Sequence, residues 1–225
     1  APLFLGGAGA FAGEWGGDGI ISFFRIPLTL LPRTAGFDII ILQPLNKSGW
    51  AAQCAVLSKG SNMKVLITTD WYAPIINGVV TSVLLLQREL EKLGHEVRVV
   101  TLSNNLHTYK DGNVYYMGSV SANKIYPGAR LKINRNRSLL HELVAWRPDV
   151  IHSQCEFSSF RVAYALSNRL GIPIVHTYHT VYEDYTHYFS PSVRVGKAVV
   201  SVFSRWICGR TACVVAPSKK GEKLL

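Results

Sequence analysis

The stretch KVLITTDWYAPIINGVVTSVLLLQRELEKLGHEVRVVTL, residues 64–102, carries the pattern from which the fold is predicted. It opens with a short apolar, β-branched run over 64–70, which is typical of a strand buried on both faces. After a loop containing a proline and an Asn-Gly pair, apolar residues recur at helical spacing over 79–93. Gly94 is placed to end that helix in a left-handed conformation, and residues 95–102 form a second strand.

The same alternation of strands and helices continues to the end of the chain. Further strands are predicted in VYYMG, DVIHSQ, PIVHTYHT and ACVVAPS, and helices over residues 136–146, 159–170 and 192–208. Strands that alternate with helices at this spacing indicate βαβ units. The predicted fold class is therefore α/β, a Rossmann-like parallel sheet with helices on both faces.

Residues 1–62 have a different character. Seven of the first twenty residues are glycine, and the apolar runs follow neither the strand nor the helix period, although FDIIILQPL is compatible with one buried strand. Met63 followed by a basic residue and a strand is typical of a protein start. We interpret residues 1–62 as an unassigned extension outside the natural mature protein, with a genuine extra strand or membrane-proximal segment as the alternative, and residues 63–225 as the Rossmann-like domain.

Composition narrows the class of partner. The net charge is +10, from 24 basic and 14 acidic residues, which suits nucleic acid, an anionic membrane or a nucleotide. The alternative is a soluble basic protein without such a partner. The four cysteines form no CxxC pair, so the expected state is reduced thiols in the cytoplasm. No window reaches the roughly 18 apolar residues of a membrane-spanning helix.

Polar and aromatic residues gather in four loops, each directly after a predicted strand. The carboxyl ends of parallel strands are where such sheets bind ligands. The first of these loops lacks both the dinucleotide and the P-loop glycine patterns. It does place Gly78 at a helix entry, where backbone N–H groups can approach a phosphate or sugar; the alternative is a simple turn glycine. The four loops are TTDWYAPIINGVV, HSQCEFSS, HTYHTVYEDYTHY and APSKKGEKL.

Three histidines in the third loop raise the question of a metal site. His176 and His179 differ by three positions, so strand alternation predicts that their side chains point to opposite faces of the sheet. No cysteine stands at ligand spacing, and the expectation is no metal. His176 is expected to be a hydrogen-bonded histidine within the sheet, and His179 to be the functional one.

Five segments together resemble the amino-terminal half of glycosyltransferase family 4, and most closely the bacterial diacylglycerol glucosyltransferases. The resemblance runs from Met63 to Leu225 and keeps the order and spacing of the motifs, of which HTYHTVYEDYTHY is the most specific. The segments are MKVLITTDWYAPIINGVVTSV, LEKLGHEVRVVT, PDVIHSQCEFSSF, GIPIVHTYHTVYEDYTHY and VVAPSKK.

This resemblance implies a GT-B fold and a retaining enzyme that transfers a hexose, glucose, from a nucleotide sugar such as UDP-glucose to a membrane lipid such as diacylglycerol. It implies no cofactor and no catalytic metal. The donor-binding half would follow Leu225, so residues 63–225 are expected to be inactive alone. The expected location is cytoplasmic, peripheral at the inner face of the cell membrane, without nucleic acid. The alternatives are a soluble or other lipid acceptor, or a non-catalytic module that binds phosphate or nucleic acid.

The resemblance also assigns roles to residues. The second loop often reads His-x-His in relatives, but Gln154 stands at the third position here, and an amide hydrogen-bonds without titrating. The expected catalytic residues are His179, Gln154 and Glu156. The expected donor-binding residues are Asn77, Gly78, Ser218 and Lys219, and the expected acceptor-binding residues are His152, Tyr182, Glu183, Asp184 and His187.

The segment SVRVGKAVVSVFSRWICGR, residues 192–210, is a basic and very apolar helix. A helical wheel places its polar side chains on one narrow arc, made of Arg194, Lys197, Ser201, Ser204, Arg205 and Cys208. With a lipid acceptor in view, we expect an anionic membrane surface to bind Arg194, Lys197, Arg205 and Trp206. The alternative is a core helix with a solvated basic edge. The basic segment RLKINRNR, residues 130–137, is a candidate for the same surface.

Overall fold

The computed structural model describes six stretches of the chain. For residues 21–23, 40–44, 193, 194 and 197 it describes the backbone alone. The six stretches are residues 21–23, 40–44, 62–123, 129–133, 138–179 and 193–216.

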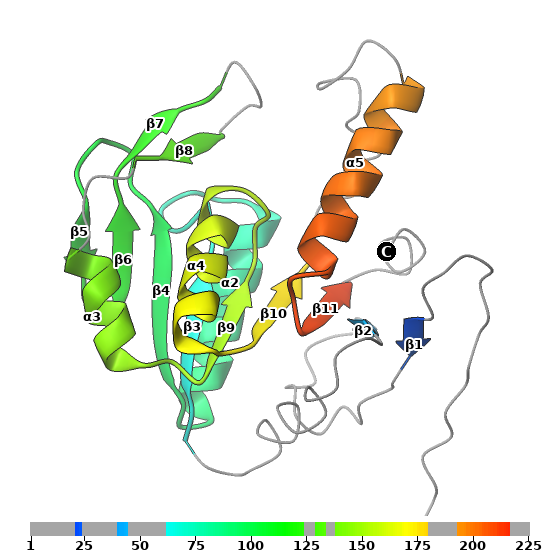
Figure 1. The fold of residues 1–225 in the computed structure, drawn as a ribbon. Helices are drawn as coiled ribbons and strands as arrows, with labels where there is room; N and C mark the ends of the chain where they lie inside the picture. The colour runs from blue at the N-terminus through cyan, green and yellow to red at the C-terminus, as the bar shows by residue number, and fades with distance from the viewer. Residues whose placement is uncertain are drawn as a thin grey trace, which may run out of the picture.

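The described strands form one nine-stranded sheet and a separate two-stranded hairpin (Figure 1). The sheet order is β1-β2-β11-β10-β9-β3-β4-β6-β5, and the six neighbours from β11 to β6 all pair in parallel. The sheet strands are β1 (Ile21–Phe23), β2 (Ile40–Pro44), β3 (Lys64–Thr68), β4 (Glu96–Leu102), β5 (Tyr109–Asp111), β6 (Val114–Met117), β9 (Val150–Ser153), β10 (Ile174–Thr177) and β11 (Cys213–Ala216). The hairpin joins β7 (Ser119–Ser121) to β8 (Arg130–Lys132).

Numbered along the chain, the six parallel strands lie in the order 3-2-1-4-5-6, which is the Rossmann order. The chain leaves β3 toward one edge, returns to β9, and then proceeds toward the other edge. The reversal falls between β3 and β9, so this is the switch point at which a Rossmann-like sheet binds its ligand. The predicted fold class is confirmed, and antiparallel strands are added at both edges.

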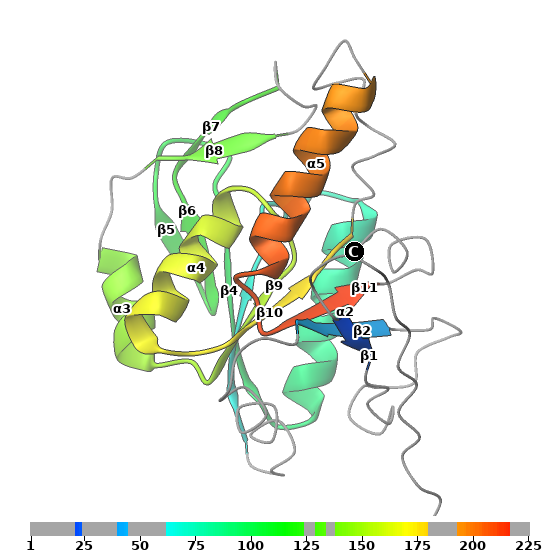
Figure 2. The same ribbon diagram turned by 45° about the vertical axis from the view of Figure 1, so that its right-hand side comes forward.

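Helices cover both faces of the sheet, as the sequence predicts. α2 (Gly78–Lys92) packs on one face, while α3 (Ser138–Trp146) and α4 (Ser158–Leu170) pack on the other (Figures 1 and 2). Alternate residues of the central strands supply the two apolar layers: Leu66 faces α3 and α4, whereas Val65 and Ile67 face α2. The strands are apolar on both sides because both sides are covered.

Specific residues start and stop these helices. Asn77 caps α2, because its side-chain oxygen accepts a hydrogen bond from the Val80 amide at 2.8 Å. The predicted left-handed ending of α2 is confirmed at Gly94, which has φ of 88°, and α4 ends at Gly171 with φ of 69°. The first strand is shorter than the predicted 64–70, since β3 stops at Thr68 and Asp70 turns away toward α4.

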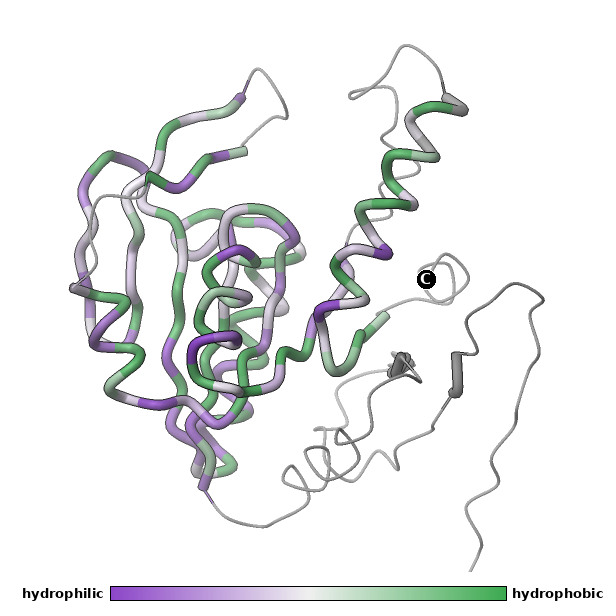
Figure 3. The backbone as a smooth tube through the Cα atoms, in the orientation of Figure 1, coloured by the Kyte–Doolittle hydropathy of each residue, from purple (hydrophilic) through white to green (hydrophobic). Residues whose placement is uncertain are grey.

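The segment FDIIILQPL does contain a strand, β2, which pairs antiparallel with β11. Beside β11, helix α5 (Val193–Cys208) rises past the carboxyl ends of the strands, and the β7–β8 hairpin rises at the same end of the sheet (Figure 1). Hydrophobic residues recur along the projecting part of α5 (Figure 3). Among the described residues, no helix has the length and apolar character needed to cross a bilayer.

Candidate functional site

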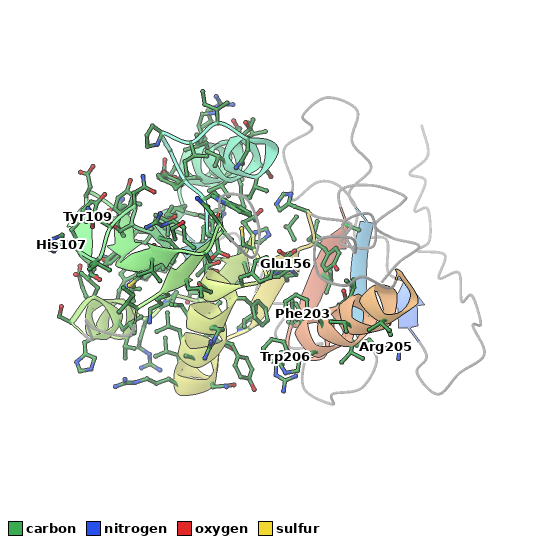
Figure 4. The ribbon with its side chains drawn as sticks, turned by 90° about the horizontal axis from the view of Figure 1, so that it is seen from above. His107, Tyr109, Glu156, Phe203, Arg205 and Trp206 are labelled. Carbon is green, nitrogen blue, oxygen red and sulfur yellow. The ribbon has the colours of Figure 1, made fainter. Side chains whose placement is uncertain are left out.

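Three of the loops predicted to carry chemistry meet at the switch point. The residues after β3, β9 and β10 lie at the same end of the sheet, and the pairing of these strands places His152 beside Val175 and Ser153 beside His176. The loop after β9 folds back onto β3, since the backbone N–H of Gln154 donates a hydrogen bond to the backbone carbonyl of Thr68 at 2.8 Å. Glu156 is seen at the centre of the molecule in Figure 4, between the central strands and α5.

His179 and Gln154, both predicted as catalytic, are in direct contact. The His179 Nε2 and the Gln154 Oε1 lie 2.6 Å apart, and an amide oxygen only accepts, so Nε2 is the donor. Burial lowers the pKa of His179 to about 4, with Glu156 opposing and His176 reinforcing the shift. His179 is therefore neutral near pH 7, with Nδ1 as its acceptor nitrogen.

His152, in β9, contacts the neighbouring strand β10. Its Nε2 is 2.8 Å from the Thr177 hydroxyl, which joins β9 to β10. Burial, and then the neighbouring His176 and His179, lower the pKa of His152 to about 3. His152 thus stays neutral near pH 7, and both His152 and His179 are half-buried.

Glu156 is buried next to His176. The two side chains approach to 3.7 Å between Glu156 Oε1 and His176 Nε2. His176 lies in β10 and is fully buried, as predicted, but neither of its ring nitrogens has a hydrogen-bond partner among the described residues. The expectation of a hydrogen-bonded histidine is therefore not met there.

The strand period used to place His176 and His179 covers only the first of them. β10 ends at Thr177, so His179 lies beyond the strand and the period of two does not extend to it. The charges of His176 and His179 instead lower the pKa of His152, and the charge of His176 lowers the pKa of His179. Across the described stretches, no group of three or more His, Cys, Asp or Glu side chains is arranged to hold a metal ion.

Asp70 is a buried carboxylate that the sequence reasoning missed. Its Oδ1 accepts a hydrogen bond from the Ser159 amide at 2.7 Å, in the first turn of α4. Burial raises the pKa of Asp70 to about 6, partly offset by the hydrogen bonds to Ser159. Residue 157, at the N-cap of α4, makes no side-chain cap bond, so Asp70 supplies the missing acceptor. An acid directly after a β-branched strand was the only available signal.

Asn77 and Gly78 lie at the exposed start of α2. Asn77 is occupied in capping the helix, as described above. A methyl group added at Gly78 would meet no atom within 4 Å, and Gly78 does not have a positive φ. Within the described chain, neither packing nor backbone strain therefore requires glycine at position 78. The space next to the first residue of α2 is open.

Several predicted residues lie outside the described part of the chain. They are the acceptor-loop residues Tyr182, Glu183, Asp184 and His187, the donor-loop residues Ser218 and Lys219, and the side chains of Arg194 and Lys197.

The helical wheel groups Ser204, Arg205 and Cys208 on one polar arc of α5, but these three side chains differ in burial. Ser204 is buried, with its hydroxyl 2.6 Å from the Tyr178 hydroxyl, and burial raises the pKa of Cys208 to about 11. The exposed face is largely apolar instead. It consists of Val195, Val199, Val202 and Trp206, which are 56%, 58%, 67% and 38% exposed at helical spacings of 4, 3 and 4.

Two of the residues predicted to bind a membrane, Arg205 and Trp206, have described side chains, and both lie at the surface of α5. Arg205 is exposed, and Trp206 packs against Phe160 and Tyr164 of α4 while keeping part of its ring in solvent (Figure 4). The Arg210 guanidinium stacks over the Trp206 ring at 4.3 Å.

Comparison with known proteins agrees with this architecture. The profile of Glycosyltransferase Family 4 matches residues 76–225. The alpha-monoglucosyldiacylglycerol synthase of Streptococcus pneumoniae (strain ATCC BAA-255 / R6) is 32% identical over 164 residues, which are 72% of this chain and 37% of the relative. That of Acholeplasma laidlawii is 38% identical over 130 residues, 57% of this chain and 32% of the relative. The chain thus spans about a third of the length of these curated relatives. It belongs to glycosyltransferase family 4, and its sheet is the Rossmann-like amino-terminal domain of the GT-B fold.

Proposed function

We propose that this chain is the acceptor-side half of a retaining glycosyltransferase that moves glucose from a nucleotide sugar, UDP-glucose, to diacylglycerol at the cytoplasmic face of the cell membrane. The names of the two relatives describe synthases of α-monoglucosyldiacylglycerol. Glucose is α-linked in such donors, so an α-linked product corresponds to retention at the anomeric carbon.

The proposal of a lipid acceptor rests on the apolar outer face of α5. Three valines and a tryptophan stand in solvent on one helical face, at the end of the sheet where His179 and Gln154 meet. A water-soluble acceptor gives no reason for such a face, whereas a helix lying on a bilayer buries its apolar side in the headgroup region. Diacylglycerol is reached only from that region.

The polar cluster supplies groups that suit the acceptor hydroxyl. Neutral His179 presents Nδ1 as an acceptor for the hydroxyl proton, while its Nε2–H is held by Gln154. Glu156 adds a buried carboxyl beside it. On the donor side, Gly78 leaves room for a phosphate or sugar to approach the first amides of α2. Each of these assignments belongs to the proposal.

The test uses the full-length protein with UDP-glucose and diacylglycerol in anionic vesicles. The expected product is a monoglucosyl lipid with retained anomeric configuration, identified by NMR. Vesicle flotation at low and high salt separates a lipid acceptor from a soluble one, because a lipid enzyme binds vesicles and responds to salt. Absence of sugar transfer to every lipid offered would refute the proposal.

A further inference from the structure

His176 is a buried titratable side chain that the proposed acceptor site leaves without a role. It lies in β10, where the strand register places it between Ser153 of β9 and Val214 of β11. The residue has no exposed surface. A neutral imidazole carries one N–H donor and one acceptor nitrogen, so histidine is less suited to full burial than the aliphatic residues of a central strand. An imidazole at this position therefore calls for a polar partner.

Two aromatic rings border the His176 imidazole. The Phe160 ring of α4 lies 5.6 Å away at an interplanar angle of 79°, and the Tyr178 ring lies 6.2 Å away at 77°. Phenylalanine has no hydrogen-bonding group, and the Tyr178 hydroxyl is engaged with Ser204 at 2.6 Å. Neither nitrogen of the imidazole has a hydrogen-bond partner among the described residues. Because a buried N–H without an acceptor is costly, a conformation in which this ring gains an acceptor is favoured.

Glu156 places an acceptor within reach of the ring. Its Oε1 lies 3.7 Å from His176 Nε2, which is within the range of an ion pair but longer than a hydrogen bond. The glutamate is itself 4% exposed, in the loop that leads from β9 into α4. A movement of roughly 1 Å would bring the two atoms to hydrogen-bonding distance. Hydrogen bonds of catalytic groups are often long until the substrate complex forms.

Glu156 also acts on the histidine that contacts Gln154. Burial has the largest effect on the pKa of His179 and lowers it, while the charge of Glu156 raises it. The carboxylate is therefore close to His179 as well as to His176. These two histidines differ in position, since His176 lies within β10 and His179 lies beyond its end. Glu156 is thus coupled to one histidine inside the sheet and to another at the candidate site.

From this geometry we propose that His176 is a positioning residue: its Nε2–H holds the Glu156 carboxylate in the orientation in which Glu156 binds the acceptor hydroxyl. His176 touches no substrate itself, because it is fully buried. The inference rests on the proposed function, in which Glu156 supplies the buried carboxyl of the acceptor site. The competing role is packing alone, in which the ring only fills space against Phe160 and Tyr178.

A double-mutant cycle on the full-length protein separates these two roles. The variants are His176→Phe, which keeps an aromatic ring without the N–H, Glu156→Gln, and their combination. The measured quantity is kcat/KM for diacylglycerol. If His176 acts through Glu156, His176→Phe lowers kcat/KM at least tenfold in the wild-type background and less than twofold in the Glu156→Gln background. Equal losses in the two backgrounds, or no loss in either, would overturn the proposal.

Two further variants separate this effect from a loss of folding. His176→Gln keeps an N–H donor, so it should retain more activity than His176→Phe, and activity equal to or below that of His176→Phe would count against the proposal. Ile174→Val is the matched control, because it removes one methyl group from a 1%-exposed residue on the same face of β10. It should lower stability while changing kcat/KM less than twofold.

NMR of the His176 ring gives a readout that needs no turnover. Nitrogen-15 spectra of the wild type should place the ring proton on Nε2, and Glu156→Gln should move the Nε2 resonance. A resonance that Glu156→Gln leaves in place would overturn the proposal. Failure of the proposed enzymatic function is seen separately, as an inactive wild-type protein in which the coupling between His176 and Glu156 is still present.

Discussion

His179 donates a hydrogen bond through Nε2 to Gln154 Oε1 across 2.6 Å, from the end of β10 to the end of β9. The bond fixes the tautomer of the histidine, because the amide oxygen has no proton to give. Nδ1 is thereby left as the acceptor nitrogen of the candidate site. An amide at position 154 can hold the histidine in this way without itself titrating.

The substitution Gln154→Glu should raise the pKa of His179. A carboxylate accepts the same hydrogen bond and adds a negative charge that favours the imidazolium, against the burial that holds the pKa at about 4. NMR titration of the His179 ring should show a pKa at least one unit higher, and the acid limb of the pH–rate profile should move with it. Gln154→Ala is the control, because it removes the bond without adding charge. An unmoved His179 titration in Gln154→Glu would contradict the contact.

Substitutions at Asp70 should separate its hydrogen bond from its charge. Asp70→Ala removes the acceptor for the Ser159 amide and should destabilise the fold by roughly 1–2 kcal/mol, as loss of a helix cap does. Asp70→Asn keeps an acceptor of the same shape and should restore most of that stability. The measurement is chemical denaturation, and equal losses in both variants would exclude the capping role.

The pH dependence of stability at Asp70 has a defined sign. Its pKa is about 6 in the folded protein against 3.8 ordinarily, so the folded state binds more protons between these values. The free energy of unfolding of the wild type should therefore fall, relative to that of Asp70→Asn, as the pH rises from about 4 to about 6. Above about pH 6 the stability curves of the two proteins should run parallel. Denaturation of both proteins across this range tests the prediction. A wild-type curve that rises relative to Asp70→Asn would reverse the assignment.

Gly78→Ala should affect donor binding without affecting stability. The added methyl group meets no atom of the chain within 4 Å, and alanine favours a helix start at least as well as glycine. If a nucleotide sugar lies against α2 as proposed, the methyl group blocks it, and KM for UDP-glucose should rise at least tenfold. Thermal unfolding provides the control. An unchanged KM would remove Gly78 from the donor site.

Two adjacent valines of α5 should give opposite results. Val200 is 8% exposed and Val199 is 58% exposed. Val200→Ser should cost about 1–3 kcal/mol of stability, since it opens space and buries a hydroxyl. Val199→Ser should leave stability within about 0.5 kcal/mol and weaken vesicle binding. Denaturation and flotation on both variants form the test. Similar stability losses at the two positions would mean that the outer face is also packed.

Much of the fold was predictable because its signals are local. The apolar run at 64–70 and the helical spacing over 79–93 identify β3 and α2 within two residues, and Gly94 was correctly placed in the left-handed conformation. Strand alternation with helices then indicates a parallel sheet, and a parallel sheet places loops at its carboxyl edge. The gathering of His179, Gln154 and Glu156 at the switch point follows from that rule.

Other features required the tertiary structure. Asp70 and Ser159 stand 89 positions apart in the sequence. No local pattern predicts that a carboxylate just after β3 caps α4, the helix that follows β9. A helical wheel shows which residues of α5 share a face, but only neighbouring elements decide which face is covered. The hydrogen bond between the Tyr178 and Ser204 hydroxyls lies on the buried side of α5, so Val199 and Val202 face solvent.

The sequence by itself therefore determined the alternation of the main strands and helices, and it predicted the edge of the sheet at which His179, Gln154 and Glu156 are found. The tertiary structure alone decided the partners of those residues and the outward face of α5. The physical reason is range: periodicity and turn chemistry act over a few residues, whereas burial and hydrogen bonding at the switch point join segments from distant parts of the chain.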